Sequence, residues 1–144
     1  MSECLTIFSC KGIAEVESLG GVGWFRLSRR RLEVCNHVII FQNAYDPRKP
    51  GDPAHHRFPV LIAEICGAHV DPSDGRVAVR VSRAAPVEGP RQVDGGRSPV
   101  RYAPDEWRKE LRIGTWQQVT QTSLEDAVAD RASWDARHRA PSAR

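Results

Sequence analysis

Long apolar runs are missing from this sequence, and none approaches the roughly 20 residues that a membrane-spanning helix needs. We therefore expect no membrane partner. The chain starts with Met1-Ser2-Glu3 rather than with basic residues ahead of an apolar stretch, so we expect no secretory signal. Cysteine is too sparse for a secreted disulfide scaffold, which favours reduced thiols in a cytoplasmic protein. The four thiols are Cys4, Cys10, Cys35 and Cys66.

Lysine is also scarce: of the 21 Lys and Arg side chains, three are lysine and 18 are arginine. A GC-rich genome explains this bias, and so does phosphate recognition, since the guanidinium group binds phosphate through two parallel hydrogen bonds. The formal net charge is only +3. A charge this small permits nucleic-acid binding through a local basic patch without requiring it.

The middle of the chain predicts a β-hairpin. Residues 58–70 form an apolar run broken only by Glu64 and His69, which predicts a strand buried on both faces, with a bend at Gly67. A turn follows, built from Asp, Pro, Ser and Gly. Valine then alternates with polar residues over 76–83, which predicts a second strand with one face in the core and an arginine-bearing face in water.

Shorter elements are expected on both sides of this hairpin. Residues 4–9 and 37–43 are β-prone, and the second run is apolar enough to be buried on both faces. The glycine-rich residues 20–23 predict a flexible connector, because they lack the lysine and Ser/Thr of a phosphate loop. The remaining expected elements are a helix at 12–19, a helix at 104–112, a strand at 113–119 and surface loops at 44–57 and 84–100.

At 144 residues, with 40% apolar and 27% charged residues, the chain is large enough to bury a core without metal or disulfides. We expect one domain over residues 1–119. Residues 120–144 read as a helical or partly disordered tail, in which Ser123 and Asp126 resemble a helix N-cap and residues 140–144 are frayed.

Several side chains suit contacts with a nucleobase. Trp24 lies close to three consecutive arginines, a combination that suits stacking on a base and holding its phosphate, although a tryptophan equally suits the core. Gln42 and Asn43 end a buried strand, where amides can read a base edge or simply begin a loop. Glu64 either pairs with an arginine, such as Arg57, or reads a ligand.

Metal and catalytic sites are weaker possibilities. The pairs Cys35/His37 and Cys66/His69 offer zinc-type ligands, but Cys66 and His69 point to opposite faces of a regular strand, so we expect no metal. No nucleophile motif or acid pair is present, and we expect no cofactor and no catalytic residue. A small nuclease would need Glu64, or the adjacent His55 and His56, as a general base.

The segment IAEICGAHVDPSD, which begins at Ile62, resembles the central signature of EVE domains in the PUA-like superfamily. In that family a strand with an I-A-E-V core leads into an aspartate–proline turn and a basic, valine-rich strand. Residues 77–81 and Pro86-Val87 continue this resemblance. Residues 37–43 resemble the preceding strand, and Trp24-Phe25-Arg26-Leu27-Ser28 resembles the opening one. The resemblance covers approximately residues 22–90.

This resemblance implies an α+β fold, a small mixed β-barrel with peripheral helices, and a cleft for a nucleobase, modified or unmodified. It places Trp24 and Ser28 beside the cleft, Gln42 and Asn43 at its rim and Glu64 near its floor. Tyr45, in the following loop, can reach back over the strand ends. The expected phosphate contacts are Arg29, Arg30, Arg31, Arg57, Arg76 and Arg80.

Three functions stay open on the sequence. The first is a non-catalytic module that binds RNA or DNA, with an affinity that falls steeply with salt. The second is an interaction or regulatory domain that docks a partner through its long loops and C-terminal segment. The third is the small nuclease. An oligomer is compatible with each of them.

Overall fold

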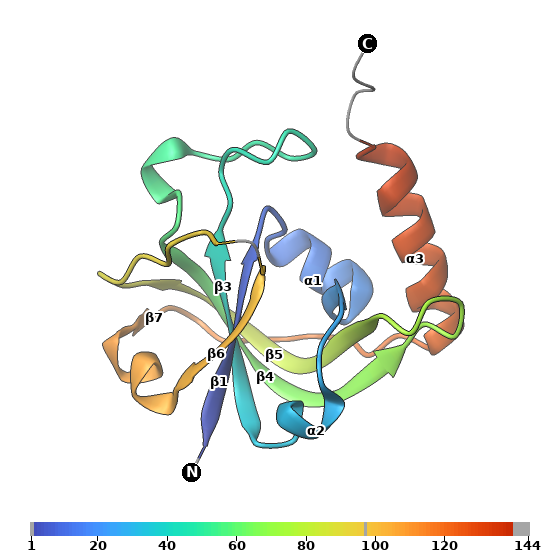
Figure 1. The fold of residues 1–144 in the computed structure, drawn as a ribbon, viewed down its shortest axis with the longest axis horizontal. Coiled ribbons are helices and arrows are strands. Elements are labelled where there is room, and N and C mark those ends of the chain that lie inside the picture. Colours follow the sequence, from blue (N-terminus) through green and yellow to red (C-terminus); the bar gives the residue numbers. More distant parts are fainter. Residues whose placement is uncertain (1, 97, 140–144) are drawn as a thin grey trace.

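The computed structural model describes residues 2–96 and 98–139. Its centre is one mixed sheet of eight strands that curls into a half-barrel, with few helices packed around it (Figure 1). Six strands follow the order β2-β5-β4-β3-β1-β6, and β7 and β8 pair with β5. The expected α+β class is confirmed, and the curled sheet is compatible with a small barrel.

The strands are β1 (Glu3–Ser9), β2 (Gly21–Phe25), β3 (Cys35–Gln42), β4 (Pro59–Val70), β5 (Val77–Glu88), β6 (Val100–Pro104), β7 (Arg112–Ile113) and β8 (Gln117–Gln118). The α-helices are α1 (Ile13–Leu19), α2 (Arg29–Leu32) and α3 (Leu124–Arg137). Two 3₁₀ helices are η1 (Pro53–His55) and η2 (Asp105–Glu110). None of the helices within the described ranges has the length and apolar character needed to cross a bilayer.

The predicted central hairpin is confirmed. β4 and β5 pair antiparallel from Val70 opposite Val77 to Leu61 opposite Pro86. The register shifts between Ile65 and Gly67, which agrees with the expected bend. β5 continues to Glu88, so the loop expected from residue 84 was placed too early. Residues 84–86 still pair with β4, Val87 and Glu88 pair with β7, and Ala84, Ala85 and Val87 are buried.

The uninterrupted apolar run of β3 is explained by burial of both faces of this strand. Val38 and Ile40 belong to one hydrophobic cluster, whereas Ile39 and Phe41 belong to a second cluster. Successive side chains of a strand point to opposite faces, so both faces of β3 are covered, as predicted. β3 pairs parallel with β1 and antiparallel with β4.

The prediction of a flexible connector at residues 20–23 was wrong, because Gly21–Phe25 is strand β2. A Cβ atom on Gly21 would lie 2.1 Å from the carbonyl oxygen of Val79, and one on Gly23 would lie 2.6 Å from the Cβ of Ala78. Glycine is therefore required here because β2 lies very close to β5, with which it pairs. Only Gly20, with φ of +74°, has the turn role expected of the run, since it caps α1.

The predicted helix at residues 104–112 is shorter and of a different type. Pro104 is the last residue of β6, whose pairing with β1 extends to Glu3, and only Asp105–Glu110 is helical, as a 3₁₀ helix. The strand expected at 113–119 is reduced to two short pairings with β5, at Arg112–Ile113 and Gln117–Gln118. The three consecutive arginines lie in the short helix α2.

The predicted C-terminal helix is present as α3. Ser123 caps it by accepting a hydrogen bond from the backbone N–H of Asp126 at 3.1 Å. Ala127 is fully buried and Trp134 is nearly so, and Ser18 of α1 donates to Asp130 of α3 at 2.6 Å. α3 therefore packs against α1 and β2. Residues 140–144, expected to be frayed, lie outside the described residues.

Candidate functional site

A cavity of about 560 Å³ opens where the parallel strands β1 and β3 end. Because the ends of parallel strands meet at one edge, the residues that follow them, Lys11 and Asn43, come together there. β2 and α3 form the opposite wall. The aromatic lining residues are Phe8, Trp24, Phe25 and Trp134, and the charged ones are Lys11, Arg48, Arg76, Arg131, Asp46 and Asp135.

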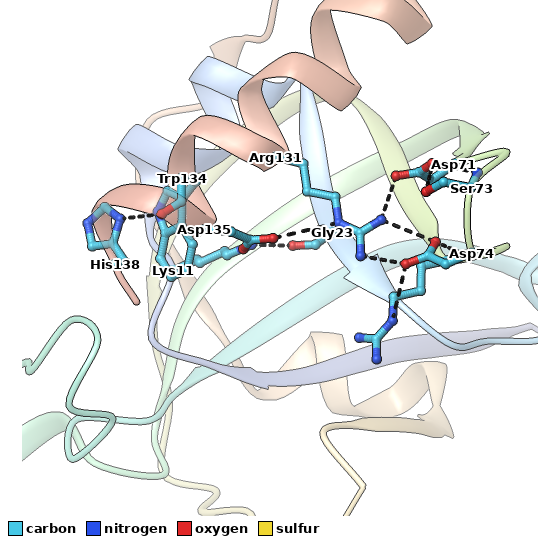
Figure 2. A network of polar contacts seen from close by, with 10 residues as sticks. Lys11, Gly23, Asp71, Ser73, Asp74, Arg131, Trp134, Asp135 and His138 are labelled. Carbon is cyan, nitrogen blue, oxygen red and sulfur yellow. Dashed lines mark hydrogen bonds and ion pairs between the residues drawn. The ribbon is translucent and has the colours of Figure 1, made fainter. Parts of the chain in front are cut away.

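Lys11 of the cavity lining is held by a backbone carbonyl and an aromatic ring. Its Nζ donates a hydrogen bond to the carbonyl oxygen of Gly23 at 2.6 Å and lies 4.5 Å from the centre of the Trp134 ring (Figure 2). Burial lowers the pKa of this ammonium, and the carboxylate of Asp135 opposes that effect. The side chain is thus held in one place by a carbonyl and an aromatic ring.

Two tryptophans form the inner wall of the cavity. Trp24 and Trp134 are each only 6% exposed. Trp134 stacks on His138, with ring centroids 4.2 Å apart, and Trp24 lies 5.4 Å from the guanidinium of Arg131. The indole Nε1 atoms of both are buried without a hydrogen-bond partner among the described residues. Phe8 and Phe25 line the same cavity and are partly exposed.

Arg131 connects α3 to the turn between β4 and β5 (Figure 2). It donates to Asp71 at 2.5 Å and to Asp74 at 2.7 Å, and its Nε lies 3.9 Å from Asp135. The hydrogen bond from Arg131 is the main reason why the pKa of Asp74 falls to about 2. Asp71 also accepts hydrogen bonds from the backbone N–H and the hydroxyl of Ser73. These bonds are the main reason why the pKa of Asp71 is lowered, and the hydrogen bond from Arg131 lowers it further.

Arg48 is similarly neutralised by a neighbour. Its Nε and Nη2 donate to Asp46 at 3.1 and 2.7 Å. This hydrogen bonding lowers the pKa of Asp46. Burial, followed by the charge of Asp46, raises the pKa of the Cys10 thiol beside them. Cys10 therefore belongs to the lining as a buried thiol with a raised pKa.

The structure brings three of the sequence-predicted site residues, Trp24, Asn43 and Arg76, to this cavity. The other expected cleft residues lie elsewhere. Ser28 caps α2 by accepting from the backbone N–H of Arg31. Gln42 lies against Gly51, and Tyr45 is 64% exposed.

Glu64 does not lie near the floor of this cavity. It accepts a hydrogen bond from Arg83, not from Arg57, at 2.5 Å, which lowers the pKa of the carboxyl. Arg83 in turn lies 4.3 Å from the ring of Trp116. This is the structural ion pair that the sequence left open, and it explains a carboxylate in an otherwise apolar strand.

The expected phosphate-binding arginines are dispersed. Arg76 lines the cavity, whereas Arg57 donates to the carbonyls of Val93 and Asp94, at 2.8 Å each. Arg80 donates to Gln121 at 2.8 Å. Arg31 pairs with Glu3 at 3.5 Å and covers the ring of Tyr102, and its neighbours Arg29 and Arg30 are exposed on α2.

The weak metal candidates do not assemble. Among the described residues, no three His, Cys, Asp or Glu side chains are placed to hold a metal ion. Cys35 is buried, and burial raises the pKa of its thiol to about 11. Cys66 is exposed, and its thiol lies 3.6 Å from the amide oxygen of Gln121.

Sequence reasoning did not predict several of the cavity residues, among them Lys11, Arg48, Arg131, Trp134 and Asp135. A helical signal was available for two of them, since Ala127, Arg131 and Trp134 recur at spacings of four and three. Lys11 and Arg48 carry no comparable pattern, because each lies in a connection between elements.

Comparisons with protein-family models, with curated proteins and with solved structures give no match for this chain. The resemblance to EVE domains therefore stays a prediction from the sequence. The proposed function rests on the cavity.

Proposed function

We propose that this protein is a non-catalytic module that binds RNA or DNA, and that the cavity at the ends of β1 and β3 receives one unstacked nucleobase. The observation that carries the proposal is the combination of about 560 Å³ of space, four aromatic side chains and four cationic side chains in one lining. The volume lies within the range of small-ligand sites, roughly 300–1,000 Å³.

The aromatic wall supports binding of a base. Phe8 and Phe25 are partly exposed on it, so their rings offer apolar surface to a planar ligand. Asn43 lies on the same lining with an amide donor and acceptor. Proteins that recognise single strands commonly combine aromatic contact with hydrogen bonds to a base edge.

The charges support binding of a phosphate at the rim. Arg48 and Arg131 each bind a carboxylate closely, at 2.7 and 2.5 Å, whereas the contact of Arg76 with Asp74 is longer, at 3.8 Å. Arg76 is therefore the rim cation that is most available to a phosphate. α2, which carries the exposed Arg29 and Arg30, lies toward the other end of the sheet, near the start of β1, where Arg31 pairs with Glu3 (Figure 1).

Fluorescence anisotropy with labelled single-stranded RNA and DNA tests the proposal. We expect the dissociation constant to rise about tenfold or more between about 50 and about 200 mM salt. Arg76→Gln should weaken binding to every sequence and reduce the salt slope by about 1. Arg112→Gln is the matched control, because Arg112 is 88% exposed on β7 and does not line the cavity.

The proposal fails if neither nucleic acid binds at about 50 mM salt with a dissociation constant below about 10⁻⁴ M, the weak end of non-specific binding. Equal losses for Arg76→Gln and Arg112→Gln would place the binding surface elsewhere on the protein.

A further inference from the structure

The ammonium of Lys11 has donors to spare inside the cavity. Lysine carries three N–H donors, and one of them binds the carbonyl oxygen of Gly23 at 2.6 Å. No carboxylate of residues 2–96 and 98–139 lies within 4.0 Å of this nitrogen. A partly buried cation without a paired anion favours a ligand that supplies an oxygen acceptor.

Lys11 is also positioned before any ligand arrives. The contact with Gly23 fixes the amine, and the Trp134 ring, 4.5 Å away, covers it. A donor held in place loses little conformational entropy on binding, so its hydrogen bond adds both affinity and selectivity. The amine donates whether it is charged or neutral.

Asp135 supplies the complementary group. Its carboxylate lines the same cavity, is 61% exposed and accepts hydrogen bonds only. Arg131 lies 3.9 Å from it but makes its shorter contacts with Asp71 and Asp74, so Asp135 keeps acceptor capacity. Figure 2 shows the Lys11 amine and the Asp135 carboxylate on the same side of Gly23. The effect of Asp135 on the pKa of Lys11 agrees with this proximity.

We infer that the cavity selects bases with a lactam edge, in which a ring carbonyl lies next to a ring N–H. Lys11 donates to the carbonyl oxygen and Asp135 accepts from the N–H. Guanine, hypoxanthine, uracil and thymine have this edge. Adenine and cytosine in the same orientation place an amino donor opposite Lys11 and a ring-nitrogen acceptor opposite Asp135, so that neither protein group is paired. The inference rests on the proposed function and adds the class of base.

Two matched pairs of oligonucleotides test it on the unmodified protein. Homopolymers of hypoxanthine and adenine carry equal phosphate charge and differ at this edge, and so do homopolymers of uracil and cytosine. We expect each lactam homopolymer to bind about tenfold more tightly than its partner, as for other paired base-edge contacts. Measurement at one salt concentration cancels the phosphate contribution.

Variants then assign the selectivity to the two residues. Lys11→Met keeps the apolar stem but removes the donor, and Asp135→Asn replaces the acceptor with a group that both donates and accepts. Each should reduce the preference to about twofold or less, from the tenfold expected for one paired edge. Lys109→Met, an exposed lysine of η2, is the control and should keep the full preference. Unchanged thermal midpoints establish that each variant is folded.

The outcomes separate the two proposals. Equal affinity within both oligonucleotide pairs overturns the lactam selection and leaves nucleic-acid binding intact. A preference that survives in both Lys11→Met and Asp135→Asn also overturns it, because other groups then read the base. Failure of every oligonucleotide to bind overturns the proposed function itself.

Discussion

Arg131 of α3 donates a hydrogen bond to Asp71 in the turn between β4 and β5, with 2.5 Å between Nη1 and Oδ2. The two residues are 60 positions apart in the sequence. The same guanidinium binds Asp74 at 2.7 Å and lies 5.4 Å from the ring of Trp24. One side chain therefore joins the C-terminal helix, the central hairpin and β2 at the wall of the cavity.

Loss of this guanidinium should loosen α3. Arg131→Ala leaves Asp71, only 3% exposed, without its cationic partner. We expect the free energy of unfolding to fall by about 1–2 kcal/mol, between the values for exposed and buried ion pairs. Urea denaturation followed by circular dichroism measures the change. Arg137→Ala, on an exposed position of the same helix, should change stability by less than about 0.5 kcal/mol, and an equal loss there would refute the assignment.

Acid should weaken the same connection. The pKa of Asp74 is about 2 in the folded protein, below the ordinary value of 3.8, because Arg131 binds its carboxylate. A depressed folded pKa adds stability that is fully present above pH 4 and is lost as the pH falls from about 4 to about 2. The urea midpoint should therefore drop across that interval. The drop should be smaller in Asp74→Asn, whereas Glu17→Gln, an exposed change on α1, should leave the wild-type profile.

Gly21 should tolerate no side chain. A Cβ atom there would lie 2.1 Å from the Val79 carbonyl oxygen, which is part of the backbone and cannot rotate away. We expect Gly21→Ala to lower the free energy of unfolding by about 1–3 kcal/mol. Gly67→Ala is the matched control, since its nearest new neighbour would be Arg80 Cδ at 3.6 Å, an ordinary contact distance. Equal destabilisation of both variants would contradict the close approach of β2 to β5.

One thiol should react much faster than the other three. Cys66 is exposed, whereas Cys4, Cys10 and Cys35 are buried. Burial raises the pKa of Cys4 to about 12 and that of Cys35 to about 11, so their reactive thiolate is scarce near neutral pH. A colorimetric disulfide reagent should show one rapid equivalent in the native protein and four in urea. Cys66→Ser should remove the rapid phase; its persistence would show that a buried thiol is reachable.

Sequence reasoning succeeded where the signal was local. The apolar residues of β3 and the strand–turn–strand pattern of β4 and β5 each predicted a segment that the structure contains. The Ser123 cap likewise marked the start of α3. In each case a few consecutive residues carry both the periodicity and the turn or cap chemistry. The helix at 104–112 failed because its start signals suit a 3₁₀ turn equally well, and because the pairing of β6 with β1 extends to Pro104.

The lining of the candidate site could be predicted from the sequence only in part. Trp24, Asn43 and Arg76, which were proposed from their residue types, line the cavity, whereas Gln42, Tyr45 and Glu64 lie outside the lining. Glu64 meets Arg83 because the register of β4 against β5 places them opposite each other, a relation that no short segment encodes. Cleft residues depend on which strand ends meet, so their identity follows from the topology.

The sequence by itself determined the alternation of buried strands and the hairpin turn, since each follows from hydrophobic periodicity or turn chemistry. Only the tertiary structure decided that glycines 21 and 23 serve close packing rather than flexibility, because the neighbouring strand β5 is distant in the sequence. It also decided that Lys11 and Asp135 face one cavity. The physical reason is that burial and pairing of charges depend on neighbours that folding brings together from distant parts of the sequence, and Lys11 and Asp135 are more than 100 residues apart.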